Sequence, residues 1–255
     1  MKTKQQLWHA TGLNLCLSVL VYAVLLGLLW LAEYLFPSLH GQFLHFDNIA
    51  WVVGIPASVV GVSYILTIRD PQNYIGFYAG IVMSVLLGVQ FLLQEQYDST
   101  FLYFCVFIPF QIKSILNWSK PVPEEEKNKP FEPEFLSLKG MLLTCLVFVL
   151  LVVADYLLAT YAFQHNGLCD EIWPKFFNGM LISSSVLANF WLIYRKNDSW
   201  IYWIIYSLAG IGLFIIVGNV FSIVLFAFFL VINSMAGIAW VKSTPREKYG
   251  WLKGI

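Results

Sequence analysis

The sequence predicts an all-α membrane protein with eight transmembrane helices, built as a parallel 3+1+3 repeat core plus one extra N-terminal helix. Composition is the first reason, because 59% of the residues are hydrophobic and 12% are charged, against about 25% charged in soluble domains. The second reason is a set of eight apolar segments of roughly 18–24 residues, the length that crosses ~30 Å of hydrocarbon as a helix. They are Leu13–Phe36, Ile49–Ile68, Tyr74–Leu93, Phe101–Trp118, Met141–Phe163, Phe176–Tyr194, Trp200–Gly218 and Phe221–Trp240.

The third reason is an internal repeat. A shift of 126 residues and then one of 122 superimposes the second to fourth segments on the sixth to eighth, with these pairs: Arg69 and Arg195, Tyr74 and Trp200, Phe77 and Trp203, Gln111 and Asn233, Trp118 and Trp240. Three helices cross the membrane an odd number of times, so a fifth helix between the triplets restores their orientation. The repeats are therefore parallel, an arrangement found in transporters with a site between the halves.

These observations divide the single membrane domain, residues 1–255, into six parts. We expect an extra helix in 1–36, repeat 1 in 47–118, a cytoplasmic linker in 119–139, a linking helix in 140–163, repeat 2 in 174–241 and a cytoplasmic tail in 242–255. Of the 15 Lys and Arg residues, all except Lys175 fall on one side of this topology. The positive-inside rule assigns that side, with both termini, to the cytoplasm.

The candidate substrate-binding residues are aromatic and amide side chains of the repeats: Gln90, Gln111, Trp200, Trp203, Tyr206 and Asn233. Trp200, Trp203 and Ser207 follow helical spacing on one face. At 1.5 Å per residue, Trp203 lies about 5 Å inside its helix and Asn233 about 10 Å inside its own, so they reach neighbouring heights. An aromatic face beside an amide suits a flat ring that is joined to a sugar.

Several of these residues have a plainer interpretation. Trp200 also fits the aromatic belt at the membrane surface. Asn233 and Asn189 also fit hydrogen bonds between helices. Asp155, an acidic residue in the middle of a helix, is interpreted first as a partner-bonded structural residue and second as a proton relay.

The residues that are missing restrict the chemistry. The helices of the two triplets contain no Lys or Arg except Lys113 near the cytoplasmic end, so a phosphorylated substrate would find no basic partner within the membrane. The four cysteines and four histidines form no metal-binding spacing, and no catalytic motif is present. We therefore expect no cofactor, no metal, no enzyme activity and no nucleic-acid partner, but a small-molecule substrate in a lipid bilayer.

The chain resembles the PnuC family of bacterial vitamin transporters. The resemblance is carried by Trp200-Ile201-Tyr202-Trp203, by Phe229–Asn233 running on to Trp240, and by Gln90 with the Gln-rich stretch that follows it. The end of the fourth segment, Ile115–Trp118, departs from the Gly-Trp-x-x-Trp-like ending frequent in that family.

The resemblance implies a SWEET-like fold, a bacterial cytoplasmic membrane and a homotrimer. It also implies facilitated diffusion of nicotinamide riboside by alternating access, with intracellular phosphorylation as the trap. Deoxynucleoside, thiamine and riboflavin are alternative substrates. A membrane sensor or scaffold is the alternative of another class. It would have a packed interface between the halves, whereas a carrier would have a central cavity lined by Gln111, Trp203 and Asn233.

Overall fold

The computed structural model describes residues 3–36, 48–95, 97–120, 133–161, 172–218 and 220–254. Within these ranges the chain is helical, with one isolated bridge between Glu134 and Lys196. The long helices are α1 (Lys4–Leu35), α2 (Ile49–Ile68), α3 (Gly76–Leu93), α6 (Leu138–Tyr161), α7 (Ile172–Ile193), α8 (Asp198–Val217) and α9 (Val220–Lys242). Seven described helical spans have the length and composition to cross a membrane, and Val52–Ile68 of α2 is a shorter apolar stretch. The prediction of an all-α membrane fold is confirmed.

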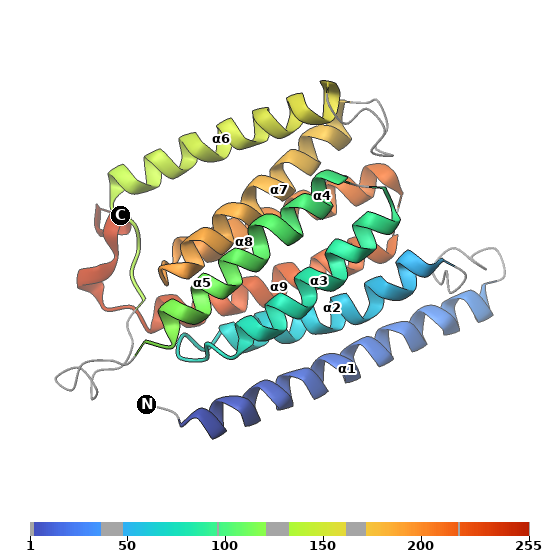
Figure 1. Cartoon of the computed structure of the whole chain (residues 1–255), viewed down its shortest axis with the longest axis horizontal. Helices are drawn as coiled ribbons and strands as arrows, with labels where there is room; N and C mark the ends of the chain where they lie inside the picture. The colour runs from blue at the N-terminus through green and yellow to red at the C-terminus, as the bar shows by residue number, and fades with distance from the viewer. Residues whose placement is uncertain are drawn as a thin grey trace.

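The packing of the helices is similar in the two halves. In the first half α2 packs on α3 and α3 on α5 (Ile108–Trp118), while in the second α7 packs on α8 and α8 on α9. The halves meet where α5 contacts α7 and where α2 contacts α9, which are equivalent pairs under the repeat. The outer helices lie on opposite sides of the bundle, α1 beside α2 and α6 beside α7, and both termini lie at the same end (Figure 1).

The first helix begins earlier than its apolar run. It starts at Lys4 instead of Leu13, because Thr3 and Gln6 form a capping box in which each side chain bonds the other's backbone N–H. The polar residues of this first turn add little hydropathy, so the apolar segment alone places the start too late.

The fourth predicted helix is interrupted. It consists of α4 (Tyr97–Phe101), the π-helical segment η2 (Leu102–Phe107) and α5. Pro109 follows this π-helical segment, where it has no N–H to give and its ring crowds the preceding turn. A π-turn before a proline relieves that conflict, and it changes the register between Tyr103 and the residues of α5.

The end that carries the termini also carries Arg69, Lys120, Arg195 and Lys242, and we call it the basic end. Here the last part of the predicted linker and the tail pack on the turn between α7 and α8. Buried Asp198 accepts hydrogen bonds from the Leu136 N–H at 2.8 Å and from Trp251 Nε1 at 2.7 Å. The backbone N–H of Trp251 donates to the Leu136 carbonyl at 2.9 Å.

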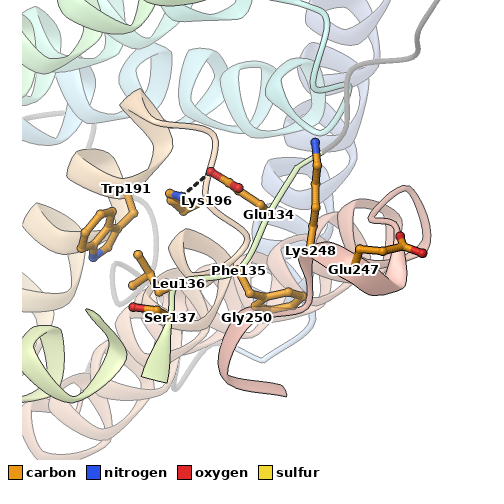
Figure 2. A pocket seen from close by; sticks show the side chains of 9 residues that line it. All are labelled: Glu134, Phe135, Leu136, Ser137, Trp191, Lys196, Glu247, Lys248 and Gly250. Atoms are coloured by element: carbon orange, nitrogen blue, oxygen red, sulfur yellow. Dashed lines mark hydrogen bonds and ion pairs between the residues drawn. The ribbon is translucent and has the colours of Figure 1, made fainter. Parts of the chain in front are cut away.

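These contacts form a clamp, which we define as residues 134–137, the α7–α8 turn and residues 244–251. The tail contains two short 3-10 segments, η4 (Arg246–Lys248) and η5 (Gly250–Gly254). Figure 2 shows the ion pair between Lys196 and Glu134 at a pocket that clamp residues and Trp191 line. The volume of this pocket is about 540 Å³. The predicted linker is thus packed at its end, and α6 begins at Leu138. Linker residues 121–132 lie outside the described ranges.

Candidate functional site

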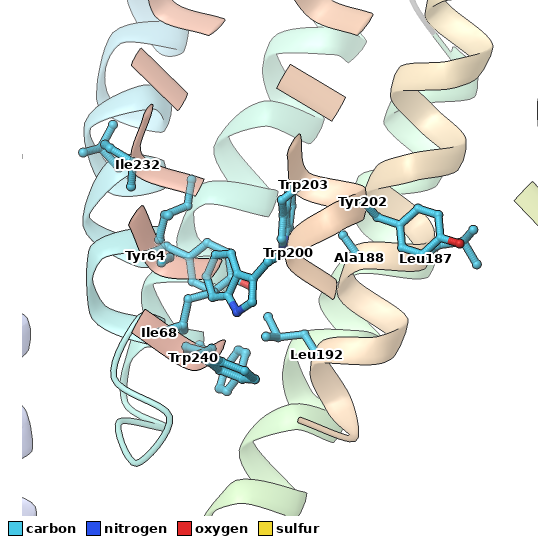
Figure 3. Close-up of a cluster of buried hydrophobic side chains, with 14 of the residues drawn as sticks. Tyr64, Ile68, Leu187, Ala188, Leu192, Trp200, Tyr202, Trp203, Ile232 and Trp240 are labelled. Atoms are coloured by element: carbon cyan, nitrogen blue, oxygen red, sulfur yellow. The ribbon is translucent and has the colours of Figure 1, made fainter. Parts of the chain in front are cut away.

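Aromatic side chains from both halves form the core near the basic end. Figure 3 shows Trp203, Trp200 and Trp240 one below another, with Tyr64 beside them. Trp200 is 2% exposed, and its ring meets Trp240 edge-on with 5.5 Å between the ring centroids. The interpretation of Trp200 as a residue of the surface aromatic belt is therefore wrong, because packing against α9 buries it.

Two indole N–H groups bind backbone carbonyls across the interface between the halves. Trp118 Nε1, at the end of α5, donates to the carbonyl of Leu192 near the end of α7 at 3.1 Å. Trp240 Nε1, near the end of α9, donates to the carbonyl of Arg69 just after α2 at 3.0 Å. We call this pair of bonds the indole latch. It follows the repeat, since each bond joins the last helix of one half to the first helix of the other.

Arg195 strengthens the same contact. Its guanidinium carbon lies 4.8 Å from the centre of the Trp118 ring, and Nη2 donates to the Trp118 carbonyl at 3.0 Å. The backbone of Arg195 is left-handed, with φ of 56°, an unusual conformation for a residue with a side chain. Burial lowers the pKa of Arg195 to about 10, so the guanidinium is still charged at neutral pH and holds Trp118 as a cation over a ring.

Further along α8, Trp203 contacts both Tyr206 on the same helix and Asn233 on α9. The count of residues from the helix ends had placed Trp203 and Asn233 at neighbouring heights. Trp203 is 6% exposed and meets the Tyr206 ring edge-on, with 5.4 Å between the centroids. Asn233 is fully buried on α9, and its Nδ2 donates to the Trp203 carbonyl at 3.3 Å and to Ser207 Oγ at 3.1 Å. Asn233 therefore makes the helix-to-helix bonds of its plainer interpretation while lying beside the aromatic pair.

Gln111 lies in a second buried network, which crosses between the halves. Its Nε2 donates to Asn189 Oδ1 on α7 at 3.0 Å and to the Tyr64 hydroxyl on α2 at 3.2 Å. Tyr64 belongs to the same hydrophobic cluster as Trp203, so the Gln111 network adjoins the aromatic core. Gln111 bonds across the interface, whereas Asn233 bonds within its own half. That the two amides converge on one substrate remains a prediction.

Gln90 is placed differently from the other predicted residues. Its side chain is partly exposed and lies against the backbone of α2, since a Cβ added at Gly54 would come within 2.9 Å of the Gln90 amide. Pro56 follows in the same stretch of α2 and removes one backbone donor there. Gln90 thus marks contact between α2 and α3, apart from the Trp203 and Gln111 contacts.

Several buried polar atoms find no hydrogen-bond partner among the described residues. Four of them are Gln111 Oε1, Asn233 Oδ1, Trp200 Nε1 and Trp203 Nε1, and the hydroxyls of Tyr22 and Tyr202 in the same core cluster are two others. Buried polar atoms in native proteins nearly always have a partner, because leaving one unpaired costs roughly 1–3 kcal/mol. A polar ligand that paired with these four atoms would remove that cost.

The structure also locates Asp155 and Asn189, for which the sequence favoured structural roles. Asp155 lies on the outer helix α6, and its Oδ2 is 3.4 Å from a Cβ built at Gly179 of α7, outside the aromatic core. Asn189, interpreted as a residue that bonds a neighbouring helix, does so, since its Oδ1 accepts from Gln111 Nε2 on α5. Within the described ranges no group of three or more His, Cys, Asp or Glu side chains has the geometry to hold a metal ion; Cys169 lies outside them.

Comparison with known proteins agrees with this architecture. Residues 50–242 match the family described as nicotinamide mononucleotide transporter. The fold is similar to a solved structure described as the vitamin B3 transporter PnuC, with a TM-score of 0.60 and 16% sequence identity over 89% of this chain and 91% of that one. The chain matches no curated protein. Since the family model covers most of its length, this multi-pass membrane protein belongs to the nicotinamide mononucleotide transporter (PnuC) family.

Proposed function

We propose that the chain takes up an unphosphorylated, nucleoside-like vitamin, nicotinamide riboside, by alternating access. The substrate would bind where the halves meet, against Trp203, Tyr206 and Trp200 and between the amides of Gln111 and Asn233. The observation that supports the proposal is the contact of Trp203 with Tyr206 and Asn233, together with unpartnered polar atoms on four buried side chains: Gln111, Asn233, Trp200 and Trp203. A ring joined to a sugar offers both a face for stacking and hydroxyl or amide groups for these atoms.

The charges nearby support a substrate without a phosphate. Lys113 is exposed although it lies two residues from Gln111, so its ammonium group points away from the network. Arg195 is engaged with Trp118 at the basic end. A phosphate carries about two negative charges at neutral pH and needs basic partners. The nicotinamide ring of the riboside is a cation, which an aromatic face stabilises by about 0.5–2 kcal/mol.

The membrane orientation is part of the proposal. Both termini lie at the basic end (Figure 1), and the positive-inside rule favours the cytoplasm for that end in a bacterial inner membrane. The indole latch would then hold the cytoplasmic end closed. Intracellular phosphorylation would trap the cargo, and the family resemblance favours a homotrimer.

The test is uptake of labelled nicotinamide riboside by purified protein in liposomes without a proton or sodium gradient. We expect uptake by the unaltered protein and at least a tenfold loss in Trp203→Ala and in Asn233→Ala. Trp173→Ala is the matched control, because that indole is 62% exposed. Absence of uptake by the unaltered protein would refute the proposed substrate. Uptake that occurs only when a pH gradient is imposed would refute facilitated diffusion and favour a proton-relay role for Asp155.

A further inference from the structure

The turn that ends α7 has an unusual residue at its tightest point. The N–H of Arg195 donates to the carbonyl of Leu192 at 3.0 Å. The next N–H, that of Lys196, donates to the carbonyl of Trp191 at 3.1 Å, which completes the pair of bonds of a Schellman motif. Such a motif has one left-handed residue, usually glycine, and here it is Arg195 with φ of 56°. A side chain at this position is strained, and it persists only where its surroundings hold it.

The linker side of the clamp holds this turn. The Asn197 N–H donates to the Glu134 carbonyl at 2.9 Å, and the Lys196 ammonium group pairs with the Glu134 carboxylate (Figure 2). Fully buried Asp198 accepts from the Leu136 N–H at 2.8 Å. Three consecutive residues after the left-handed arginine are therefore bound to the linker, and the backbone that follows the arginine is fixed.

The tail side closes the clamp over the linker. Gly250 is left-handed with φ of 53°, and a Cβ built there would lie 2.0 Å from the Leu136 carbonyl oxygen, so the two backbones are in contact. The Trp251 indole donates to Asp198 Oδ1 at 2.7 Å. Because the tail binds both the linker and the turn, its release would loosen both.

The first half of the chain provides a comparison for this turn. Arg69 is the equivalent of Arg195 in the repeat, but its N–H bonds the Ile65 carbonyl four residues earlier, at 3.1 Å, as in an ordinary helical turn. The Arg69 side chain is exposed, whereas the guanidinium carbon of Arg195 lies 4.8 Å from the centre of the Trp118 ring. The turn that the clamp holds is therefore the one whose arginine rests on an indole of the opposite half.

From these contacts we infer that the clamp is an autoinhibitory strap for the basic end. By fixing the α7–α8 turn, the tail and the linker keep Arg195 in its strained conformation and on Trp118, one of the two tryptophans of the indole latch. Release of the tail frees Arg195 to leave Trp118, and the basic end then opens more often. The inference rests on the proposed function only in treating the basic end as a gate.

The test measures opening of the basic end and needs no transported substrate. Ala236 is fully buried in the aromatic cluster, so Ala236→Cys, in a chain without its four native cysteines, reacts with an impermeant thiol reagent when that end opens. Trp251→Phe and Gly250→Ala loosen the tail by different routes. Each should raise the labelling rate about threefold to tenfold, because part of the energy that holds the turn is lost.

Arg195→Gly tests whether the tail acts through this arginine. Glycine takes up the left-handed conformation without strain, so the turn keeps its shape while the contact with Trp118 is lost. Labelling should rise by about threefold or more, and Trp251→Phe should add little in this background, because both changes act on one contact. Arg69→Ala removes the exposed equivalent side chain and keeps the backbone carbonyl that the latch uses. It is the matched control and should leave labelling unchanged.

Two results would overturn the inference. If the tail variants lower the Tm but leave labelling unchanged, the clamp only stabilises the fold. If Trp251→Phe raises labelling as much in Arg195→Gly as in the unaltered chain, the tail acts by another route. Neither result involves nicotinamide riboside, so failure of the proposed substrate in the uptake assay is distinguishable from failure of the strap.

Discussion

We predict that the indole latch keeps the basic end closed, and replacing its tryptophans tests this directly. Trp118→Phe and Trp240→Phe keep an aromatic ring in the core but remove the N–H groups that bind the carbonyls of Leu192 and Arg69. In the closed state each carbonyl then loses its partner, whereas in an open state water can hydrate it. The substitutions therefore raise the free energy of the closed state relative to the open one.

The magnitude follows from burial of the two bonds. An unpaired buried carbonyl costs about 1–3 kcal/mol, and about 1.4 kcal/mol changes an equilibrium tenfold. The Trp118 bond is buried and the Trp240 bond is partly buried, so Trp118→Phe should have the larger effect. That variant also weakens the stacking with Arg195, because phenylalanine is a poorer partner for a cation. We expect roughly tenfold more open state for Trp118→Phe and less for Trp240→Phe.

Cysteine labelling measures the open population. Ala236 is fully buried in the aromatic cluster, so Ala236→Cys in a chain freed of its four native cysteines reports opening. A membrane-impermeant thiol reagent applied at the basic end should label it about tenfold faster in Trp118→Phe. Trp8→Phe, in which the indole is 50% exposed, is the control. Unchanged labelling in a folded Trp118→Phe protein would refute the latch.

Two further predictions concern packing. Gly210→Ala should destabilise the protein by about 1–3 kcal/mol in denaturant or thermal unfolding, because a Cβ there would lie 2.0 Å from the Phe226 ring. The control is Gly12→Ala, which has open space around its Cβ and should be neutral or slightly stabilising. Equal effects of the two substitutions would contradict the packing argument. Trp251→Phe removes one of the two hydrogen bonds to Asp198. It should lower the free energy of unfolding by about 1.5–3 kcal/mol, the range for hydrogen bonds to charged groups. An unchanged Tm, or faster proteolysis far from the tail, would argue against the clamp.

Local sequence features predicted most of the fold. Apolar runs long enough to cross a bilayer located the helices, and the 126-residue and 122-residue shifts located the equivalent positions. The early start of α1 could also be predicted from the sequence, since Thr3 and Gln6 have the spacing of a capping box. The search for apolar segments missed it because these residues are polar. The π-helical segment before Pro109 was less accessible, because a proline within an apolar run can be accommodated by a kink as well as by a π-turn.

Contacts between distant parts of the chain decided the rest. Trp200 fits both the membrane surface and the core by spacing, and only its contact with Trp240 decides between them. Asn189 looked like one of many polar helix contacts, because its bond to Gln111 joins residues 78 positions apart. Asp198 has no partner nearby in the sequence that would reveal its role, since Leu136 and Trp251, which bond it, come from the linker and the tail.

The way the outer helices pack bears on how the chain could be divided. Because α1 lies on α2 as α6 lies on α7, each triplet is preceded by one helix that packs on its first helix. A cut in the linker therefore leaves two pieces that each begin and end on the same side. If the chain were divided between Pro121 and Pro130, each piece would carry its own basic residues at the basic end, which would orient it in the membrane. Co-expression of the two pieces would then assemble the protein from separate polypeptides.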